Sequence, residues 1–105
     1  MFDFKQLQKL QEEVQRKLAK AEDELSAKTV EATAGGGMVT VTANGQQEII
    51  SVKINPEAID PDDPEMLEDL VIAAINSAIA KSKELREQTM RQITGGFGLP
   101  GGLPF

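Results

Sequence analysis

Apolar residues near the start of the chain recur at alternating steps of three and four. They are Phe4, Leu7, Val14, Leu18, Ala21 and Leu25, and only Gln11 interrupts the heptad pattern. This spacing predicts an amphipathic helix over residues 3–26. Because a helix rises about 1.5 Å per residue, it would span roughly 35 Å. That is long for a chain of 105 residues.

A two-residue alternation follows and predicts a short antiparallel sheet. Residues 30–34 alternate Val and Ala with Glu and Thr, and glycines at 35–37 turn the chain into a strand over 38–42 that is rich in β-branched residues. The Asn-Gly pair at 44–45 is a strong hairpin signal. We expect the third strand to place Ser51 and Lys53 on one face. Its other face should carry three aliphatic residues: Ile50, Val52 and Ile54.

Prolines and acids mark the approach to a second helix. Residues 55–64 hold three prolines and predict a loop, which ends in an N-cap at Asp63 and Pro64 at the first helical position. The helix should run to about Ile93, before two glycines stop it. The Gly- and Pro-rich residues 95–105 predict a flexible tail. Residues 1–94 would then form a single domain.

The second helix has a wider apolar arc than one thin sheet can cover. One face consists of Leu67, Leu70, Val71, Ala74, Ala78 and Leu85. Beside it lies a second apolar face: Ile72, Ile75 and Ile79. A helix that is apolar over most of its circumference is buried on more than one side. The pattern therefore predicts an α+β protomer, in the order α-β-β-β-α, that forms a two-fold homodimer. The weaker alternative is a monomer with a distorted second helix.

Composition excludes several classes of function. The chain has no Cys and no His, so it cannot build a thiolate or imidazole metal site, and it lacks the commonest general base. We expect no enzyme activity, no cofactor and no small-molecule substrate. The sequence contains no apolar run of membrane-spanning length. We therefore expect no membrane partner, and the absence of Cys fits a reducing cytoplasm.

Two motifs that resemble ligand sites have simpler interpretations. The glycines at 35–37 precede a strand, whereas a phosphate-binding loop leads into a helix. The acidic residues 60–65 lack the ligand spacing and the central glycine of an EF-hand. A hairpin turn and helix capping explain them better.

Charge is distributed unevenly along the chain. The formal net charge is −6, yet residues 57–69 contain seven acids and no base, so the remainder carries a small positive charge. On the first helix four bases share one face opposite the apolar stripe: Lys5, Lys9, Arg16 and Lys20. This basic stripe is either a solvated surface or a contact for phosphates. Four bases on the second helix do not share a face: Lys81, Lys83, Arg86 and Arg91.

The residue types also limit how a nucleic acid could be held. The chain has no Trp and no Tyr, and none of its four Phe residues falls in a predicted strand, so single-strand stacking is not expected. Lysines outnumber arginines, and no Arg/Asn cluster suggests bidentate base reading. What remains is contact with the backbone of duplex DNA, with little sequence preference.

Several segments resemble the YbaB/EbfC family of nucleoid-associated proteins. They are residues 35–45 (GGGMVTVTANG), 54–60 (INPEAID), 65–70 (EMLEDL), 73–78 (AAINSA) and 95–101 (GGFGLPG). The resemblance covers nearly the whole chain and is densest from Gly35 onward. It implies a tweezer-like homodimer whose projecting helices bind duplex DNA in the nucleoid, without a cofactor or a reaction.

The resemblance supplies no DNA-contact motif that can be laid onto single positions. The candidate DNA-binding residues therefore come from charge alone: Lys5, Lys9, Arg16, Lys20, Lys81, Lys83, Arg86 and Arg91. The alternative is a dimeric adaptor that binds a protein partner without touching DNA. Both hypotheses are compatible with further protein partners.

Overall fold

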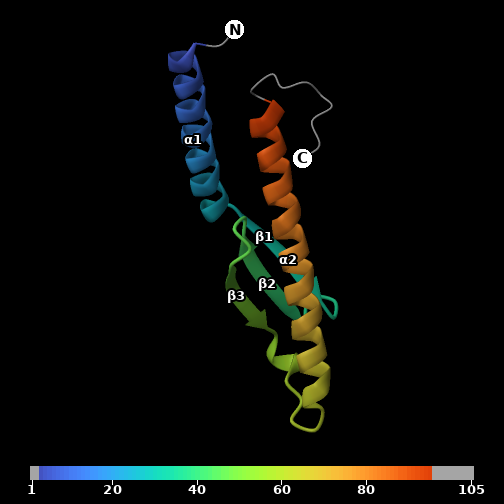
Figure 1. Cartoon of the computed structure of the whole chain (residues 1–105). Coiled ribbons are helices and arrows are strands. Elements are labelled where there is room, and N and C mark those ends of the chain that lie inside the picture. The colour runs from blue at the N-terminus through green and yellow to red at the C-terminus, as the bar shows by residue number, and fades with distance from the viewer. Residues whose placement is uncertain (1–2, 96–105) are drawn as a thin grey trace.

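The computed structural model describes residues 3–95, which form two long helices and one sheet (Figure 1). The elements are α1 (Phe4–Ala27), β1 (Thr29–Ala34), β2 (Val39–Asn44), β3 (Ile49–Ile54), the short 3-10 helix η1 (Pro56–Ala58) and α2 (Pro64–Gly95). The strands are antiparallel in the order β1-β2-β3. The predicted α+β fold in the order α-β-β-β-α is confirmed. Residues 96–105, almost all of the predicted tail, lie outside the described residues.

Helix α1 begins at a capping box. The Asp3 side chain accepts a hydrogen bond from the backbone of Lys5, and the Gln6 side chain accepts one from the backbone N–H of Asp3. The helix ends where Lys28 turns to an extended conformation and leads into β1. Only Ala21 and Leu25 of α1 are buried. The helix is therefore anchored at its C-terminal end.

Two turns of the sheet depend on glycine for different reasons. Gly35, Gly36 and Gly37 all have positive φ angles, as the tight connection from β1 to β2 requires. Gly45 does not have a positive φ angle, and in the loop from β2 to β3 it is Gln47 that has one. A Cβ on Gly45 would instead lie 2.8 Å from the backbone oxygen of Leu25. The Asn-Gly pair thus marks the hairpin correctly, but its glycine serves the contact with α1.

The core lies between α2 and one face of the sheet. Ala32, Val39, Val41 and Ala43 of the strands pack with Ala74 and Ala78 of the helix, and all six are buried. The small alanines let the helix backbone approach the sheet closely. Leu67, Leu70, Val71 and Ile75 close the edges of this cluster. The first apolar face predicted for α2 packs on the sheet except at Leu85, which is not part of this cluster, and Ile75 of the second face joins it.

Strand β3 remains uncovered by α2, which packs on β1 and β2. Val52 and Ile54 pair with the buried Val41 and Val39 and so share their face of the sheet, yet they are 41% and 37% exposed. A register shift at Thr42/Ala43 pairs Ile49 with Ala43 and leaves Ile50 without a cross-strand partner, so the regular three-residue alternation is interrupted there. Here an irregular register overrides simple alternation.

The connection into α2 is more ordered than a plain loop. Asn55 caps the 3-10 turn by accepting a hydrogen bond from the N–H of Glu57, and Ala58 is buried. Asp63 accepts one from the N–H of Met66 at 3.3 Å, which confirms the predicted N-cap. Helix α2 continues through Gly95, two residues past the predicted end.

Candidate nucleic-acid interface

Most of α1 projects beyond the sheet, beside the C-terminal half of α2 (Figure 1). From residue 4 to residue 20, which we call the α1 arm, every residue is exposed except the half-buried Val14 and Lys17. The molecule is elongated, with principal extents of 71 × 25 × 16 Å. An arm of this kind offers a long surface to a partner rather than an enclosed pocket.

The four bases of the predicted stripe are all exposed on this arm, and Lys20 also lines the groove between α1 and α2. Lys5, Lys9, Arg16 and Lys20 are all exposed and recur on one face of a continuous helix. The opposite face carries the apolar stripe, where Phe4, Leu7, Leu10 and Leu18 are 71%, 44%, 43% and 39% exposed. The arm is therefore amphipathic, and neither of its faces is covered within the protomer.

The four candidate bases of α2 are not brought together. The ammonium of Lys81 donates to the backbone oxygen of Glu31 in β1 at 2.9 Å. Arg86 makes a two-pronged ion pair with Glu22 of α1, at 2.6 and 3.1 Å. Lys83 and Arg91 are exposed at other positions around the helix. Two of the four candidates thus have protein acceptors already.

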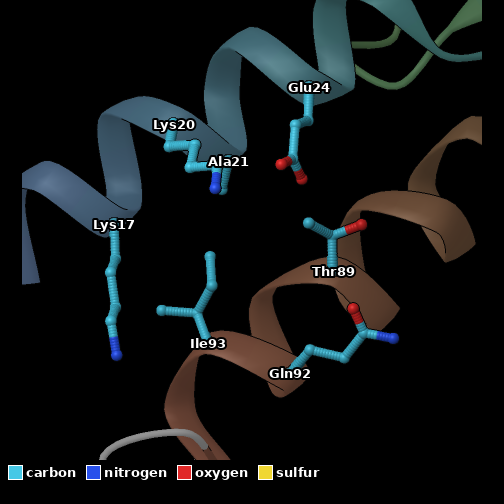
Figure 2. Close-up of a pocket in the computed structure, with 7 residues that line it drawn as sticks. All are labelled: Lys17, Lys20, Ala21, Glu24, Thr89, Gln92 and Ile93. Atoms are coloured by element: carbon cyan, nitrogen blue, oxygen red, sulfur yellow. The ribbon is translucent and has the colours of Figure 1, made fainter.

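A groove between α1 and α2 adds a residue that the charge pattern did not single out. A cavity of about 270 Å³ is lined by Lys17, Lys20, Ala21, Glu24, Thr89, Gln92 and Ile93. Figure 2 shows both lysines extending from α1 toward the side of the groove formed by α2. Lys17 also pairs with Glu13 at 3.6 Å. In the sequence, only the position of Lys17 between the basic and the apolar stripes of the helix could have indicated that it lines this groove.

The acidic segment lies far from the arm. Residues 57–69 cover η1, the following loop and the first turns of α2, at the end of the molecule opposite the N-terminus of α1 (Figure 1). The negative and positive surfaces are therefore separated along the long axis. A polyanion could approach the arm without meeting the acidic end.

Glu22 and Arg86 are the groups whose titration the structure changes most clearly. Hydrogen bonding to Arg86 holds the pKa of the Glu22 carboxyl below its usual range, and partial burial opposes this only in part. The same hydrogen bond raises the pKa of Arg86. Both groups are charged at neutral pH, so the pair is an ion pair rather than an acid–base site.

The described residues contain neither a cluster of metal ligands nor a membrane-spanning helix. Among residues 3–95 there is no cluster of three or more acidic side chains that could hold a metal ion. Neither helix, in the part of the chain described, is long and apolar enough to cross a membrane.

Comparison with known proteins shows to which family a chain with this geometry belongs. The model of the YbaB/EbfC DNA-binding family matches residues 1–97. The chain belongs to this family. YbaB/EbfC proteins are not enzymes, which agrees with the exclusion of catalysis from composition.

The relatives extend over most of the chain. A nucleoid-associated protein of Bacillus cereus (strain B4264) is 57% identical over 86 residues, which is 82% of this chain and 79% of the relative. One from Caldanaerobacter subterraneus subsp. tengcongensis is 52% identical over 98 residues, covering 93% and 85%.

A solved structure supports the fold. The crystal structure of an uncharacterized protein from Helicobacter pylori superposes with a TM-score of 0.80, covering 90% of this chain and 99% of that one. The sequence identity is 23%, so this likeness concerns the fold alone.

Proposed function

We propose that this YbaB/EbfC protein is a nucleoid-associated protein of the cytoplasm that binds duplex DNA as a homodimer. Binding would occur mainly through phosphates and with low sequence specificity. The observation that carries the proposal is the α1 arm, where Lys5, Lys9, Arg16 and Lys20 form an exposed stripe. The names of its relatives support the association with the nucleoid.

The homodimer is supported by an apolar surface that the protomer leaves bare. On β3, Val52 and Ile54 face the α2 side of the sheet without being covered by it. On α2, Ile72 is 57% exposed, beside the half-buried Ile75 and Ile79. Exposed aliphatic residues on a sheet and on the helix that packs against it are typical of a protein interface. A second copy would cover them and present two arms.

Phosphate contact is favoured over base reading by the residues available. Lysines on a mobile stem make point contacts to phosphates, and they lack the planar fork that reads guanine. We assign the first contacts to the stripe on the arm, and Lys83 and Arg91 to a secondary role. We assign Lys81 and Arg86 to the contacts within the protein that they already make, with Glu31 and Glu22.

A salt titration tests this proposal. Binding should be measured with several duplexes of unrelated sequence, and log affinity should fall linearly with log salt concentration for all of them. The slope should be about −0.9 for each phosphate contacted. Affinity that is independent of salt, or confined to one duplex, would contradict it.

The exposed apolar stripe of the arm favours a second candidate function, that of an adaptor for a protein partner. Phe4, Leu7 and Leu10 are exposed in the protomer. A partner held by this face would bind with little dependence on salt, because hydrophobic contacts are not screened. The same titration therefore separates the two functions.

A further inference from the structure

The α1 arm is held at its base, where α1, the loop from β2 to β3 and α2 meet. The backbone N–H of Gly45 donates to the oxygens of Leu25 (2.8 Å) and Lys28 (3.1 Å). The side chain of Asn44 reaches the oxygen of Ser26 at 3.4 Å. These contacts fix the last turn of α1 but leave the angle of the rest of the helix to other interactions.

One turn further toward the tip, Glu22 links α1 to both other elements. Its two carboxylate oxygens accept from the two terminal nitrogens of Arg86 on α2, at 2.6 and 3.1 Å. The amide nitrogen of Gln46 donates to the backbone oxygen of Glu22 at 3.1 Å and to its carboxylate at 3.3 Å. A paired guanidinium and carboxylate constrain orientation as well as distance. This link therefore restricts rotation of α1 against α2.

A restriction at this point has a large effect at the tip of the arm. Phe4 precedes Glu22 by 18 residues, which is about 27 Å of helix. A rotation of about 10° at Glu22 would move the tip by about 5 Å. That exceeds the separation of about 4 Å within which a charged pair counts as an ion pair.

We propose that the Glu22–Arg86 ion pair positions the α1 arm, and that it thereby supports DNA binding without either residue contacting DNA. The proposal rests on the proposed function, in which the stripe on this arm meets the phosphates. It also gives Arg86 a role different from the phosphate contact that its charge suggested.

Electrostatics and positioning predict opposite results for one substitution. Glu22→Ala removes a negative charge from α1 at the base of the arm, so charge alone predicts tighter binding to DNA. Loss of a positioning contact predicts weaker binding instead, by about five-fold or more. Asp23→Ala is the matched control, because it removes one acid from the neighbouring exposed position. This control should bind as tightly as the wild type or more tightly.

A charge exchange provides the rescue. The double variant Glu22→Arg/Arg86→Glu keeps the net charge and can form the reversed pair, so it should bind DNA within about two-fold of the wild type. If Arg86 itself contacts phosphate, the exchange leaves a carboxylate in its place and binding stays weak. That result would overturn the proposal.

Arm geometry can be measured without DNA. The chain has no Cys, so spin labels can be placed through Gln8→Cys and Gln88→Cys, in labelled chains diluted with unlabelled chains. Electron–electron distance measurements should give one narrow distribution in the wild type and in the charge exchange, and a broader or shifted one in Glu22→Ala. Circular dichroism checks that each variant is folded.

The two readouts separate the proposal from the function on which it rests. An unchanged distance distribution in Glu22→Ala would overturn the positioning role, and so would a changed distribution with affinity equal to that of Asp23→Ala. Failure of the wild-type protein to bind any duplex would instead remove the proposed function. The distance measurement would then still decide whether the pair directs the arm.

Discussion

Glu22 is the residue whose titration is most directly linked to the fold, through its ion pair with Arg86. Its pKa is lowered chiefly by the hydrogen bond from Arg86, whereas a glutamate in an unfolded chain titrates near pH ~4.3. A group whose pKa is lower in the folded state than in the unfolded chain stabilises the fold when the pH is above its unfolded pKa. This stabilisation is lost as the pH falls through its folded pKa.

We therefore predict that the stabilising effect of Glu22 depends on pH. The difference in melting temperature between the wild type and Glu22→Ala should be largest near neutral pH and should shrink as the pH falls below the pKa of about 4.3 of an unfolded glutamate. Thermal denaturation followed by circular dichroism at several pH values measures it. A difference that stays constant with pH would show that the ion pair is not its cause.

Gly45 is a residue where the space available decides the amino acid. Because a Cβ would lie 2.8 Å from the Leu25 oxygen and 2.6 Å from its Cδ2, Gly45→Ala should displace the end of α1. We expect a loss of about 1–3 kcal/mol in the free energy of unfolding. Gly36→Asn is the control, since nothing lies within 4 Å of its Cβ position and Asn tolerates a positive φ. Equal losses in the free energy of unfolding of the two variants, measured by urea denaturation, would contradict this explanation.

At the scale of the elements, local patterns were sufficient to locate the helices and strands. Asp63 and Pro64 predicted the start of α2, and the heptad spacing predicted α1 within a residue at each end. The bulge at Thr42/Ala43 was not predictable, because it depends on the pairing of two strands rather than on either one. It leaves Ile50 without a cross-strand partner.

The candidate site was predicted less completely than the fold. The basic stripe of α1 follows from helical spacing alone, and the structure places it on an exposed arm. The Glu22–Arg86 pair joins residues 64 positions apart, and no short-range pattern distinguishes those two charges from their neighbours. Side chains that meet only through tertiary packing cannot be recognised in this way.

The predicted tail can be tested directly by truncation. Residues 95–105 are rich in Gly and Pro and offer little periodic apolar surface. A chain ending at Thr94 should keep the helical circular dichroism and the melting temperature of the full chain. A fall of many degrees would indicate that Phe97, Leu99 or Leu103 contributes to packing.

For the whole molecule, the bare surface of β3 and α2 makes dimerisation the main expectation. Light scattering at micromolar concentration should give about twice the chain mass of 11.4 kDa. Ile72→Asp should give a folded monomer, because Ile72 is 57% exposed in the protomer and adds little to its core. Ala73→Asp, at an exposed position on another side of α2, is the control and should remain dimeric. A monomeric wild type would remove the homodimer from the proposed function.

The central claim is that the stripe on the α1 arm holds DNA through its phosphates. Lys9→Glu/Arg16→Glu reverses two charges of the stripe, and Lys28→Glu/Lys53→Glu reverses two exposed lysines away from it, with the same change in net charge. Binding to unrelated duplexes should be titrated with salt for both double variants and the wild type. We predict that the first variant weakens binding to every duplex and flattens the salt dependence, while the second keeps most of both. Equal losses in the two variants, or normal binding by the first, would contradict the claim.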